Sequence, residues 1–377
     1  MSSVKIPNFH RLVSITMQDL RKEFPVLTSY TYLNTASCGL LSKSLTKWRQ
    51  EHDLLMLAGG STYRDTHKEH LESVRNTVAR FFDVNRGELA LVPNFSYGMN
   101  TLLEGLSNGL KVLLIKDDYP SINWGVEFRD FDTCYASLDG ILEDNIAEAI
   151  EKYRPDVFAF SIVQYLSGIK IDFDFLKEVK TKYPDLLLIG DGTQFLGTSS
   201  FSFEESPLDV LGASCYKWML SGYGNGIFMI KEELHKKISP STIGFNSSDS
   251  MDPTIMNVPL MKRFEPGHQD ALNYGSIERS IQHFERVGMK QIETNLKTLN
   301  LHAKECFSEY NLLDTNVLKR KDHSCIYTIR GDEERFQKLK ENNIICSLRG
   351  NGIRVSFHYY NSLDDLNHLM SVIRKMN

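Results

Sequence analysis

The sequence predicts an α/β fold with two parts: a large domain whose mainly parallel sheet is sandwiched by helices, and a smaller α+β C-terminal domain. Between residues 111 and 190, short apolar runs alternate with amphipathic helical stretches, which is the βαβ rhythm of a parallel sheet. These apolar runs are nearly continuous, as expected for strands that helices cover on both faces. After about residue 260 the rhythm gives way to a long helical stretch and several short strands.

The expected elements follow from the spacing of apolar residues. In the large domain, apolar runs predict strands over 111–116, 156–163 and 185–190, and helical stripes predict helices over 140–154 and 172–183. Beyond residue 260 we expect a helix over roughly 276–308, a strand over 324–330, a helix near 331–341, a strand pair near 344–357 and a terminal helix near 362–376.

The 377 residues are too many for one simple small domain, because single cores of this size usually divide. We predict an N-terminal segment over 1–30 that packs with the small domain, a large domain over 31–260 and a small domain over 261–377.

The composition excludes several classes of partner. With 43 Lys and Arg against 48 Asp and Glu, the chain lacks the basic excess of nucleic-acid-binding proteins. No apolar run approaches the roughly 18–20 residues that span a bilayer, and the N-terminus lacks the hydrophobic stretch of a secretory signal. The 6 cysteines form no CxxC pair and are expected to be free thiols. We therefore expect a cytoplasmic protein that contacts neither nucleic acid nor a membrane.

Two segments that follow predicted strands carry the most suggestive polar residues. Asp191-Gly192-Thr193-Gln194 comes directly after the strand 185–190, and Ser214-Cys215-Tyr216-Lys217-Trp218 lies further along the chain. Ligands of open α/β sheets bind beyond the carboxyl ends of strands. Asp191 alone could be a capping residue, and a lone lysine is usually solvated. Lys217, however, stands among uncharged residues, which lower the pKa of an amine and suit it to forming an imine.

The Asp-x-x-Gln segment, with Ser-x-Tyr-Lys ending 26 residues after the aspartate, resembles the class V aminotransferase family of fold-type I pyridoxal-phosphate enzymes. This family includes cysteine desulfurases, kynureninase and isopenicillin N epimerase-like proteins, and the resemblance covers roughly residues 30–365. It implies pyridoxal 5'-phosphate (PLP) held as a Schiff base on Lys217, with Asp191 facing the pyridine nitrogen and keeping it protonated. Gln194 would hydrogen-bond the phenolic oxygen of the ring, and Lys217 would also shuttle the proton at the substrate α-carbon.

The resemblance also implies residues around the phosphate. Asn94-Phe95-Ser96 stands where the family has its phosphate turn, so the Phe95 and Ser96 amides and the Ser96 hydroxyl would donate to it; a capping serine would use the same geometry. Ser214 and Tyr216 match a family Ser and His that face the phosphate. His268, in Phe264-Glu265-Pro266-Gly267-His268-Gln269, replaces a family Thr whose turn reaches the phosphate of the other subunit, which implies a homodimer.

Further positions are implied around the ring. Tyr119, in Asp117-Asp118-Tyr119-Pro120-Ser121, stands at the ring-stacking position, and a core tyrosine is the alternative. In Gln164-Tyr165-Leu166-Ser167-Gly168, one of the first two residues approaches the phenolic side of the cofactor, and we favour Gln164.

The substrate side has two matching segments. Arg354 lies in the segment Ile353-Arg354-Val355-Ser356, which matches the Arg-x-Ser strand of the family. Its guanidinium could bind the substrate carboxylate through two parallel hydrogen bonds, and a surface arginine is the alternative. Tyr32-Leu33-Asn34-Thr35-Ala36-Ser37 matches the segment that lines the substrate side, with Ala36 and Ser37 as the expected contacts.

Other motifs point away from specific chemistries. Only Gly350-Asn351-Gly352 separates Arg349 from Ile353, so the loop that carries the nucleophilic cysteine of cysteine desulfurases is missing. Cys346 lies in a strand-like segment, where a thiol is usually buried and inert. We therefore expect the chain not to be a cysteine desulfurase. The glycines at 222, 224 and 226 precede a strand, unlike a dinucleotide-binding loop. His67 and His70 lack an evident third ligand, so no metal is expected.

These observations predict a PLP-dependent enzyme acting at the α-carbon of a small amino acid, by an epimerase-type or lyase-type reaction or by transamination. One alternative is a regulatory protein that keeps the cofactor without catalysis, and another is a structural protein with a decayed site. Against decay, each charged contact that the family resemblance implies is present, namely Asp191, Lys217 and Arg354.

Overall fold

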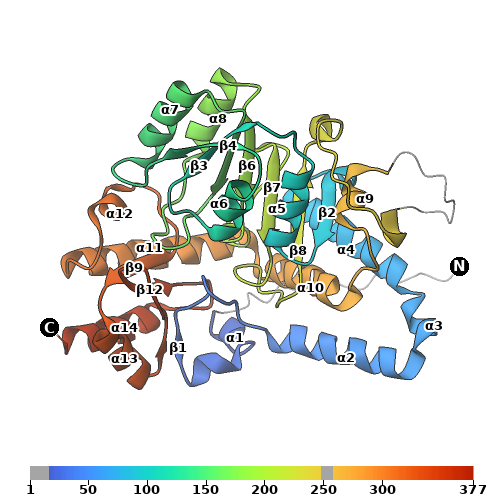
Figure 1. The fold of residues 1–377 in the computed structure, drawn as a ribbon. Helices are drawn as coiled ribbons and strands as arrows, with labels where there is room; N and C mark the ends of the chain where they lie inside the picture. Colours follow the sequence, from blue (N-terminus) through green and yellow to red (C-terminus); the bar gives the residue numbers. More distant parts are fainter. Residues whose placement is uncertain (1–16, 248–257, 377) are drawn as a thin grey trace, which may run out of the picture.

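The computed structural model describes residues 17–247 and 258–376. Within them, a 7-stranded sheet with the order β2-β8-β7-β6-β5-β3-β4 forms the centre of the molecule (Figure 1). Its strands are β2 (Leu89–Val92), β3 (Lys111–Ile115), β4 (Asp132–Ala136), β5 (Val157–Ser161), β6 (Leu187–Asp191), β7 (Val210–Ser214) and β8 (Gly226–Ile230). β8 runs antiparallel to β2 and β7, and the other neighbouring pairs are parallel. The predicted α/β fold class is confirmed.

Helices cover both faces of this sheet because successive strand residues point to opposite sides. Val112 and Leu114 of β3 belong to the core beneath α5 (Phe95–Glu104), α6 (Pro120–Glu127) and α9 (Leu260–Phe264). Leu113 and Ile115 of the same strand belong to the core beneath α4 (His67–Phe82), α7 (Leu142–Tyr153), α8 (Phe173–Lys182) and α10 (Ala271–Val287). The continuous apolar runs in the sequence therefore reflect two cores.

The helical stretch expected over roughly 276–308 is present, but it consists of two helices instead of one. α10 ends at Val287, and α11 (Met289–Glu309) begins after Gly288. Gly288 has a φ of 90°, a backbone conformation that glycine adopts without the steric cost of a side chain. The apolar stripe continues across the break, so periodicity alone did not reveal it.

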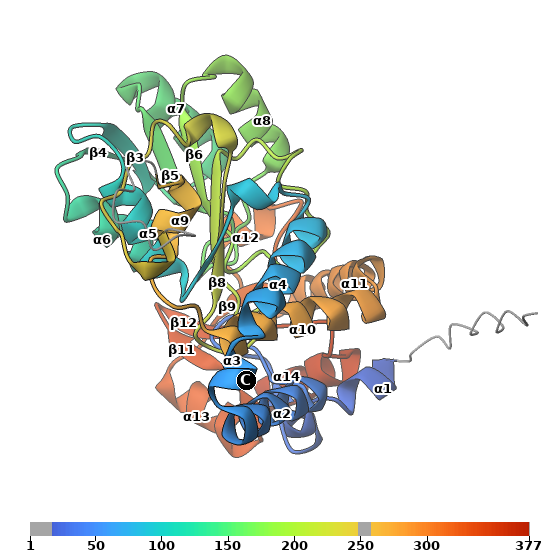
Figure 2. The same ribbon diagram turned by 90° about the vertical axis from the view of Figure 1, so that its right-hand side faces the viewer.

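A smaller antiparallel sheet lies at the other end of the molecule from α7 and α8 (Figure 2). Its order is β11 (Ser347–Arg349), β12 (Gly352–Ser356) and β9 (Ile326–Arg330). α13 (Glu333–Glu341) and α14 (Leu363–Arg374) lie in the same region, and α12 (Thr315–Lys319) precedes β9. The strand pair and terminal helix expected here are present.

The N-terminal part of the described chain joins this smaller sheet region. β1 (Thr31–Tyr32) pairs in parallel with β10 (Ile344–Ile345), and Asn34 forms a bridge with Ser356. α1 (Met17–Arg21) precedes β1, and α2 (Lys43–Gly59) and α3 (Ser61–Arg64) then lead to α4. Among the helices of residues 17–247 and 258–376, none is long and apolar enough to cross a membrane. The domain boundaries at residues 30 and 260 stay a prediction.

Candidate functional site

The carboxyl ends of the parallel strands bring the predicted charged residues to one edge of the large sheet. Asp191 is the last residue of β6, and the strand register places it beside Ser161 of β5 and Gly212 of β7. Lys217 follows the end of β7 at Ser214. Both Asp191 and Lys217 are buried. Their side chains therefore share the edge at which open α/β sheets bind ligands.

Burial governs the ionisation of this pair. Removal from water lowers the pKa of the Lys217 amine, while the Asp191 carboxylate opposes this shift and Arg354 and Arg349 reinforce it. Removal from water raises the pKa of Asp191, and the Thr193 N–H, which donates to Asp191 Oδ1 at 2.8 Å, opposes that rise. A lysine whose pKa is depressed spends more time as the neutral amine, which is the form that attacks a carbonyl carbon.

Aromatic rings flank the Lys217 amine. Its Nζ atom lies 5.5 Å from the ring centroid of Tyr119 and 5.5 Å from that of Tyr216. Tyr216 in turn stacks on Tyr223 with centroids 4.4 Å apart. Burial raises the pKa of the Tyr216 phenol, so its hydroxyl stays protonated and can donate a hydrogen bond. The structure thus brings the predicted residues Tyr119, Tyr216 and Lys217 together.

The segment 36–39 runs directly against the backbone of Lys217. The Gly39 N–H donates to the Tyr216 carbonyl at 3.0 Å, and a Cβ on Gly39 would lie only 2.0 Å from the Lys217 carbonyl oxygen. The Ala36 N–H donates to Ser356 Oγ at 2.9 Å. This close approach requires glycine at position 39, and it places the Ala36 and Ser37 segment beside the lysine.

The two predicted glutamines already have partners within the protein. Gln194 Nε2 donates to the Ala36 carbonyl at 2.9 Å, and its Oε1 accepts from Trp218 Nε1 at 2.7 Å. Gln164 Oε1 accepts from the N–H groups of Leu166 and Ser167 at 2.8 and 2.6 Å. Gln164 therefore shapes its own turn, and the sequence did not reveal this contact. The roles of both side chains toward the cofactor stay predictions.

The predicted phosphate residues meet at the N-terminus of α5. The Phe95 N–H donates to Ser214 Oγ at 2.8 Å, and Ser96 Oγ lies 2.7 Å from Ser121 Oγ. Asn94 caps the helix by accepting from the Tyr97 N–H at 2.9 Å. Among the described residues, the Ser96 N–H has no acceptor. A helix N-terminus with a free N–H and two hydroxyls is suited to an anion, although the Phe95 amide is already engaged by Ser214.

Sequence reasoning gave Asp118 no role, yet this residue fixes the position of Tyr119. Asp118 is buried, and its two oxygens accept from the N–H groups of Tyr119 and Ser161, each at 2.7 Å. The carboxylate therefore ties the turn after β3 to the end of β5. Burial raises its pKa. The pair Asp117-Asp118 was visible in the sequence, but only the fold shows which of the two faces inward.

Arg354 presents unused hydrogen-bond donors at the same site. It is 2% exposed on β12, and its Nη1 donates to the Tyr165 carbonyl at 2.7 Å. Its Nε has no partner among the described residues. Burial, together with Arg349, lowers the pKa of Arg354 to about 10. A buried guanidinium without a carboxylate partner is poised to bind an anionic ligand.

His268 stands apart from this cluster. It is exposed, and its ring packs on Phe245 with centroids 4.9 Å apart. The neighbouring Glu265 is buried, pairs with Arg75 and accepts from the Leu91 N–H at 2.6 Å. These contacts anchor the turn on β2 and leave His268 at the surface. Its predicted contact with another subunit stays a prediction.

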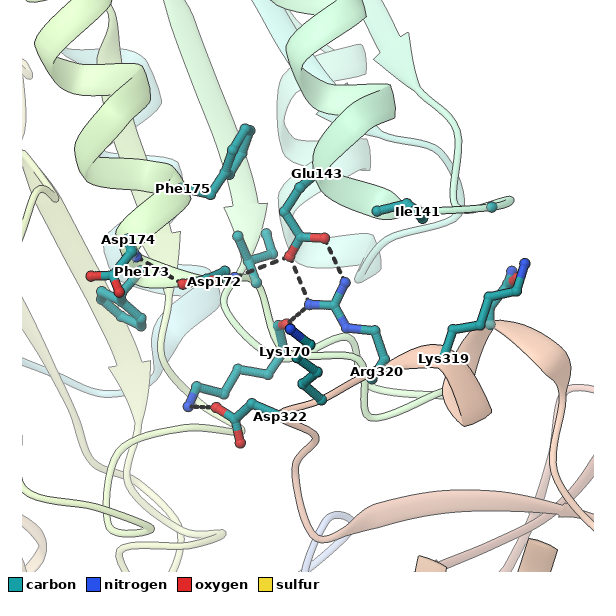
Figure 3. A pocket seen from close by; sticks show the side chains of 14 residues that line it. Ile141, Glu143, Lys170, Asp172, Phe173, Asp174, Phe175, Lys319, Arg320 and Asp322 are labelled. Atoms are coloured by element: carbon teal, nitrogen blue, oxygen red, sulfur yellow. Dashed lines mark hydrogen bonds and ion pairs between the residues drawn. The ribbon is translucent and has the colours of Figure 1, made fainter.

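A cavity of about 590 Å³ lies away from the Lys217 cluster, between α7, α8 and the segment 319–322 (Figure 3). Four of its charged residues form two ion pairs. Arg320 donates to both Glu143 oxygens at 2.5 and 2.7 Å, and Lys170 lies 2.6 Å from Asp322. Because these pairs join the segment before β9 to α7 and the segment before α8, we interpret the cavity as a structural junction. A second cavity of about 500 Å³ is lined partly by Gln194 and Trp218.

Neither the histidines nor Cys346 forms a further reactive centre. His67 and His70 lie near His52 around Trp48, and no group of three potential ligands in the described residues is arranged to hold a metal. Burial raises the pKa of the Cys346 thiol to about 12, so this thiol is protonated at neutral pH.

Comparison with known proteins places this site in a family. The family model "Aminotransferase class-V" matches residues 42–369. An uncharacterized aminotransferase of Bacillus subtilis is 22% identical over 94% of this chain and 97% of its own length. Among solved structures, the apo cysteine desulfurase of Thermococcus onnurineus has a TM-score of 0.82 at 20% identity, covering 100% of this chain and 99% of that one. The cystine C–S lyase C-DES, in complex with cysteine persulfide, has a TM-score of 0.82 at 18% identity, covering 92% and 98%.

These findings correct one expectation from the sequence. We expected the chain not to be a cysteine desulfurase, yet probable and established cysteine desulfurases are among its relatives and structural neighbours. The short β11–β12 connection, Gly350-Asn351, is real, but it does not support this exclusion. Relatives and neighbours of this kind are abundant, so the length of one loop does not by itself set this activity aside.

The residues present fit pyridoxal 5'-phosphate. They supply a buried amine with a depressed pKa beside a buried carboxylate, an N–H without an acceptor at a helix N-terminus, and an arginine Nε without a partner. Another structure of C-DES holds glycine covalently linked to its PLP cofactor. The chain therefore belongs to the class V aminotransferase family of PLP-dependent enzymes.

Proposed function

We propose that this enzyme acts at the α-carbon of a small amino acid, as an epimerase, a lyase or an aminotransferase. The observation that carries the proposal is the buried Lys217 amine beside Asp191. The positive charge of Arg354 is close enough to lower the pKa of the same amine further. Lys217 would hold the cofactor, Asp191 would face its pyridine nitrogen, and Arg354 would bind the substrate carboxylate.

Each residue has a distinct task in this reaction. The cofactor, when bound, supplies a protonated ring that withdraws electrons from the substrate α-carbon. Asp191 would keep the ring nitrogen in its charged form, and the Thr193 N–H orients the carboxylate for this. Lys217 Nζ would remove or return the α-proton, and its depressed pKa favours this at neutral pH. Tyr119, fixed by Asp118, would stack on the ring.

The phosphate would be held where α5 begins. The Ser96 N–H and hydroxyl, with Ser121 beside them, would donate to the phosphate at the positive end of the helix. Ser214 would support this site through its bond to the Phe95 N–H. Binding at the helix end would leave Lys217 and Asp191 free for the reacting part of the cofactor.

Borohydride reduction followed by peptide mass mapping tests the proposal. The purified protein, loaded with PLP, should carry the reduced adduct on the peptide containing Lys217. Lys217→Ala should lose both the adduct and the visible absorbance band, whereas Lys116→Ala, at an exposed position just beyond β3, should keep both. A colourless wild-type protein, or an adduct at another lysine, would contradict the assignment.

A substrate panel then separates the reactions. Amino acids, including cysteine and cystine, are assayed for keto acid, ammonia, sulfide and inverted enantiomer. Keto acid formed only with an added amino acceptor identifies an aminotransferase, whereas ammonia or sulfide without an acceptor identifies a lyase. Arg354→Met should raise KM for the accepted amino acid, because the carboxylate loses its cation. No turnover of any amine would refute the proposal.

We also propose a cytoplasmic homodimer in which the turn at Gly267 and His268 contacts the other subunit. The anchored turn and the exposed His268 ring support this. Analytical ultracentrifugation of the PLP-loaded protein should show a dimer at micromolar concentration, and a monomer would count against it. His268→Ala should weaken PLP retention more than His302→Ala, which alters an exposed histidine on α11.

A further inference from the structure

The β11–β12 hairpin carries two arginines on one face. Arg349 pairs with Gly352, and Ser347 pairs with Arg354. Opposed residues of an antiparallel pair share a face, and so do residues two apart along one strand. Arg349 and Arg354 are therefore diagonal neighbours, about 7–8 Å apart at their backbones. This face contacts the segment 32–37, which is predicted to line the substrate side. Ser347 Oγ donates to Asn34 Oδ1 at 2.7 Å, and Ser356 Oγ accepts from the Ala36 N–H at 2.9 Å.

Neither arginine has a carboxylate partner among the described residues. Arg354 donates to the Tyr165 carbonyl oxygen, and the neighbouring charged group that affects its pKa is the cation Arg349. Arg349 is exposed and forms no ion pair or hydrogen bond with a described carboxylate. Burial is the main influence on the pKa values of Lys217 and Tyr165, and both arginine cations act to lower these two pKa values. Two like charges on one face repel each other, so a bound anion that neutralises them would be stabilised there.

The backbone of the hairpin end is held by its neighbours. Gly350 has a φ of 57°, and a Cβ on it would contact the Leu166 side chain at 3.7 Å. β12 is paired with β9 on its other edge, and the carbonyl of Leu166 accepts from Thr328 Oγ1 of β9 at 2.8 Å. The hairpin end is thus held between the small sheet and the turn that contains Tyr165.

We propose that the substrate is an amino acid with a second acidic group, and that Arg349 binds this group while Arg354 binds the α-carboxylate. The substrate class is that of aminodicarboxylic acids and their sulfinate or sulfonate analogues. This inference rests on the proposed function, because it names the substrate of the same site. Arg349 at the exposed turn of the hairpin and Arg354 at its buried end would hold the two acidic groups of the substrate.

Calorimetric titration of the PLP-loaded protein with unreactive acids tests the inference without requiring turnover. Succinate and glutarate supply two carboxylates, and propionate and butyrate supply one. We expect a diacid to bind wild type about tenfold or more tightly than the matching monoacid, as one further charge-assisted pair would produce. Arg349→Ala should reduce this ratio to near unity, and Arg349→Lys should restore part of it.

Arg330→Ala is the matched control. Arg330 is an exposed arginine on the same small sheet, opposite Gly352, but it is already engaged by the Asn311 carbonyl and lies 3.8 Å from Asp314. This variant should keep the wild-type ratio. Equal binding of diacids and monoacids by wild type, or an unchanged ratio in Arg349→Ala, would overturn the inference while leaving the cofactor on Lys217. Absence of the Lys217 adduct would instead refute the proposed function.

Discussion

Replacement of Gly39 by alanine should disable the site through the backbone of Lys217. The added Cβ would lie 2.0 Å from the Lys217 carbonyl oxygen and 2.7 Å from that of Tyr216, whereas real Cβ contacts under 3.0 Å are essentially never seen. The two segments must therefore separate by about 1 Å. A misplacement of about 1 Å can cost about 100-fold in rate, because the amine no longer meets the reacting atoms in the productive geometry.

The assay is kcat/KM on the best amino acid of the panel, with urea unfolding to establish that the variant folds. We expect a loss of about 100-fold in Gly39→Ala. Gly87→Ala is the control, since a Cβ there has no neighbour within 4 Å, and it should behave as wild type. If Gly39→Ala folds and keeps wild-type kcat/KM and cofactor absorbance, the close approach does not position Lys217 and the reasoning is wrong.

Three further predictions follow from burial and backbone geometry. The rate of PLP uptake by the apoprotein, measured by stopped-flow absorbance, should rise with pH through a pKa below that of ordinary lysine. Asp191→Asn should move this inflection to lower pH, because the carboxylate raises the pKa of Lys217. A shift to higher pH would contradict this electrostatic argument. Arg75→Met should lower the free energy of unfolding in urea by about 3–5 kcal/mol, because Glu265 would stay buried without its partner; a loss typical of a surface pair would show that the turn is not held this way. Gly288→Ala should cost about 1–3 kcal/mol in the same assay, because its φ of 90° suits only glycine, and unaltered stability would refute that reason.

The parts of the fold that the sequence predicted are those set by local patterns. The parallel strands β3, β5 and β6 follow from apolar runs, and the spacing of Asp191 and Lys217 follows from the strands that precede them. The break at Gly288 could not be predicted, because the apolar stripe is the same on either side of it.

The parts of the site that the sequence missed depend on contacts between distant segments. Gln164 and Gln194 were assigned to the cofactor by resemblance, yet both have hydrogen bonds within the protein that only the folded chain reveals. Asp118 gained its role from the register of β3 beside β5, and Arg349 from the register of β11 against β12. Residue type alone cannot distinguish such positions from solvated surface charges.

The N-terminal segment pairs with strands from the C-terminal part of the chain, and this affects folding during synthesis. β1 pairs with β10, and Asn34 contacts Ser347 and Ser356. During translation the segment that supports Ala36 leaves the ribosome first, but the strands on which it rests are made among the last. A nascent chain can therefore form its sheet around β6 and β7 before β10 and β12, which support the segment 34–36, have been synthesised. A chain that terminated before residue 344 would lack β10 and β12, and with them the Ser356 contact to Ala36 and the guanidinium of Arg354.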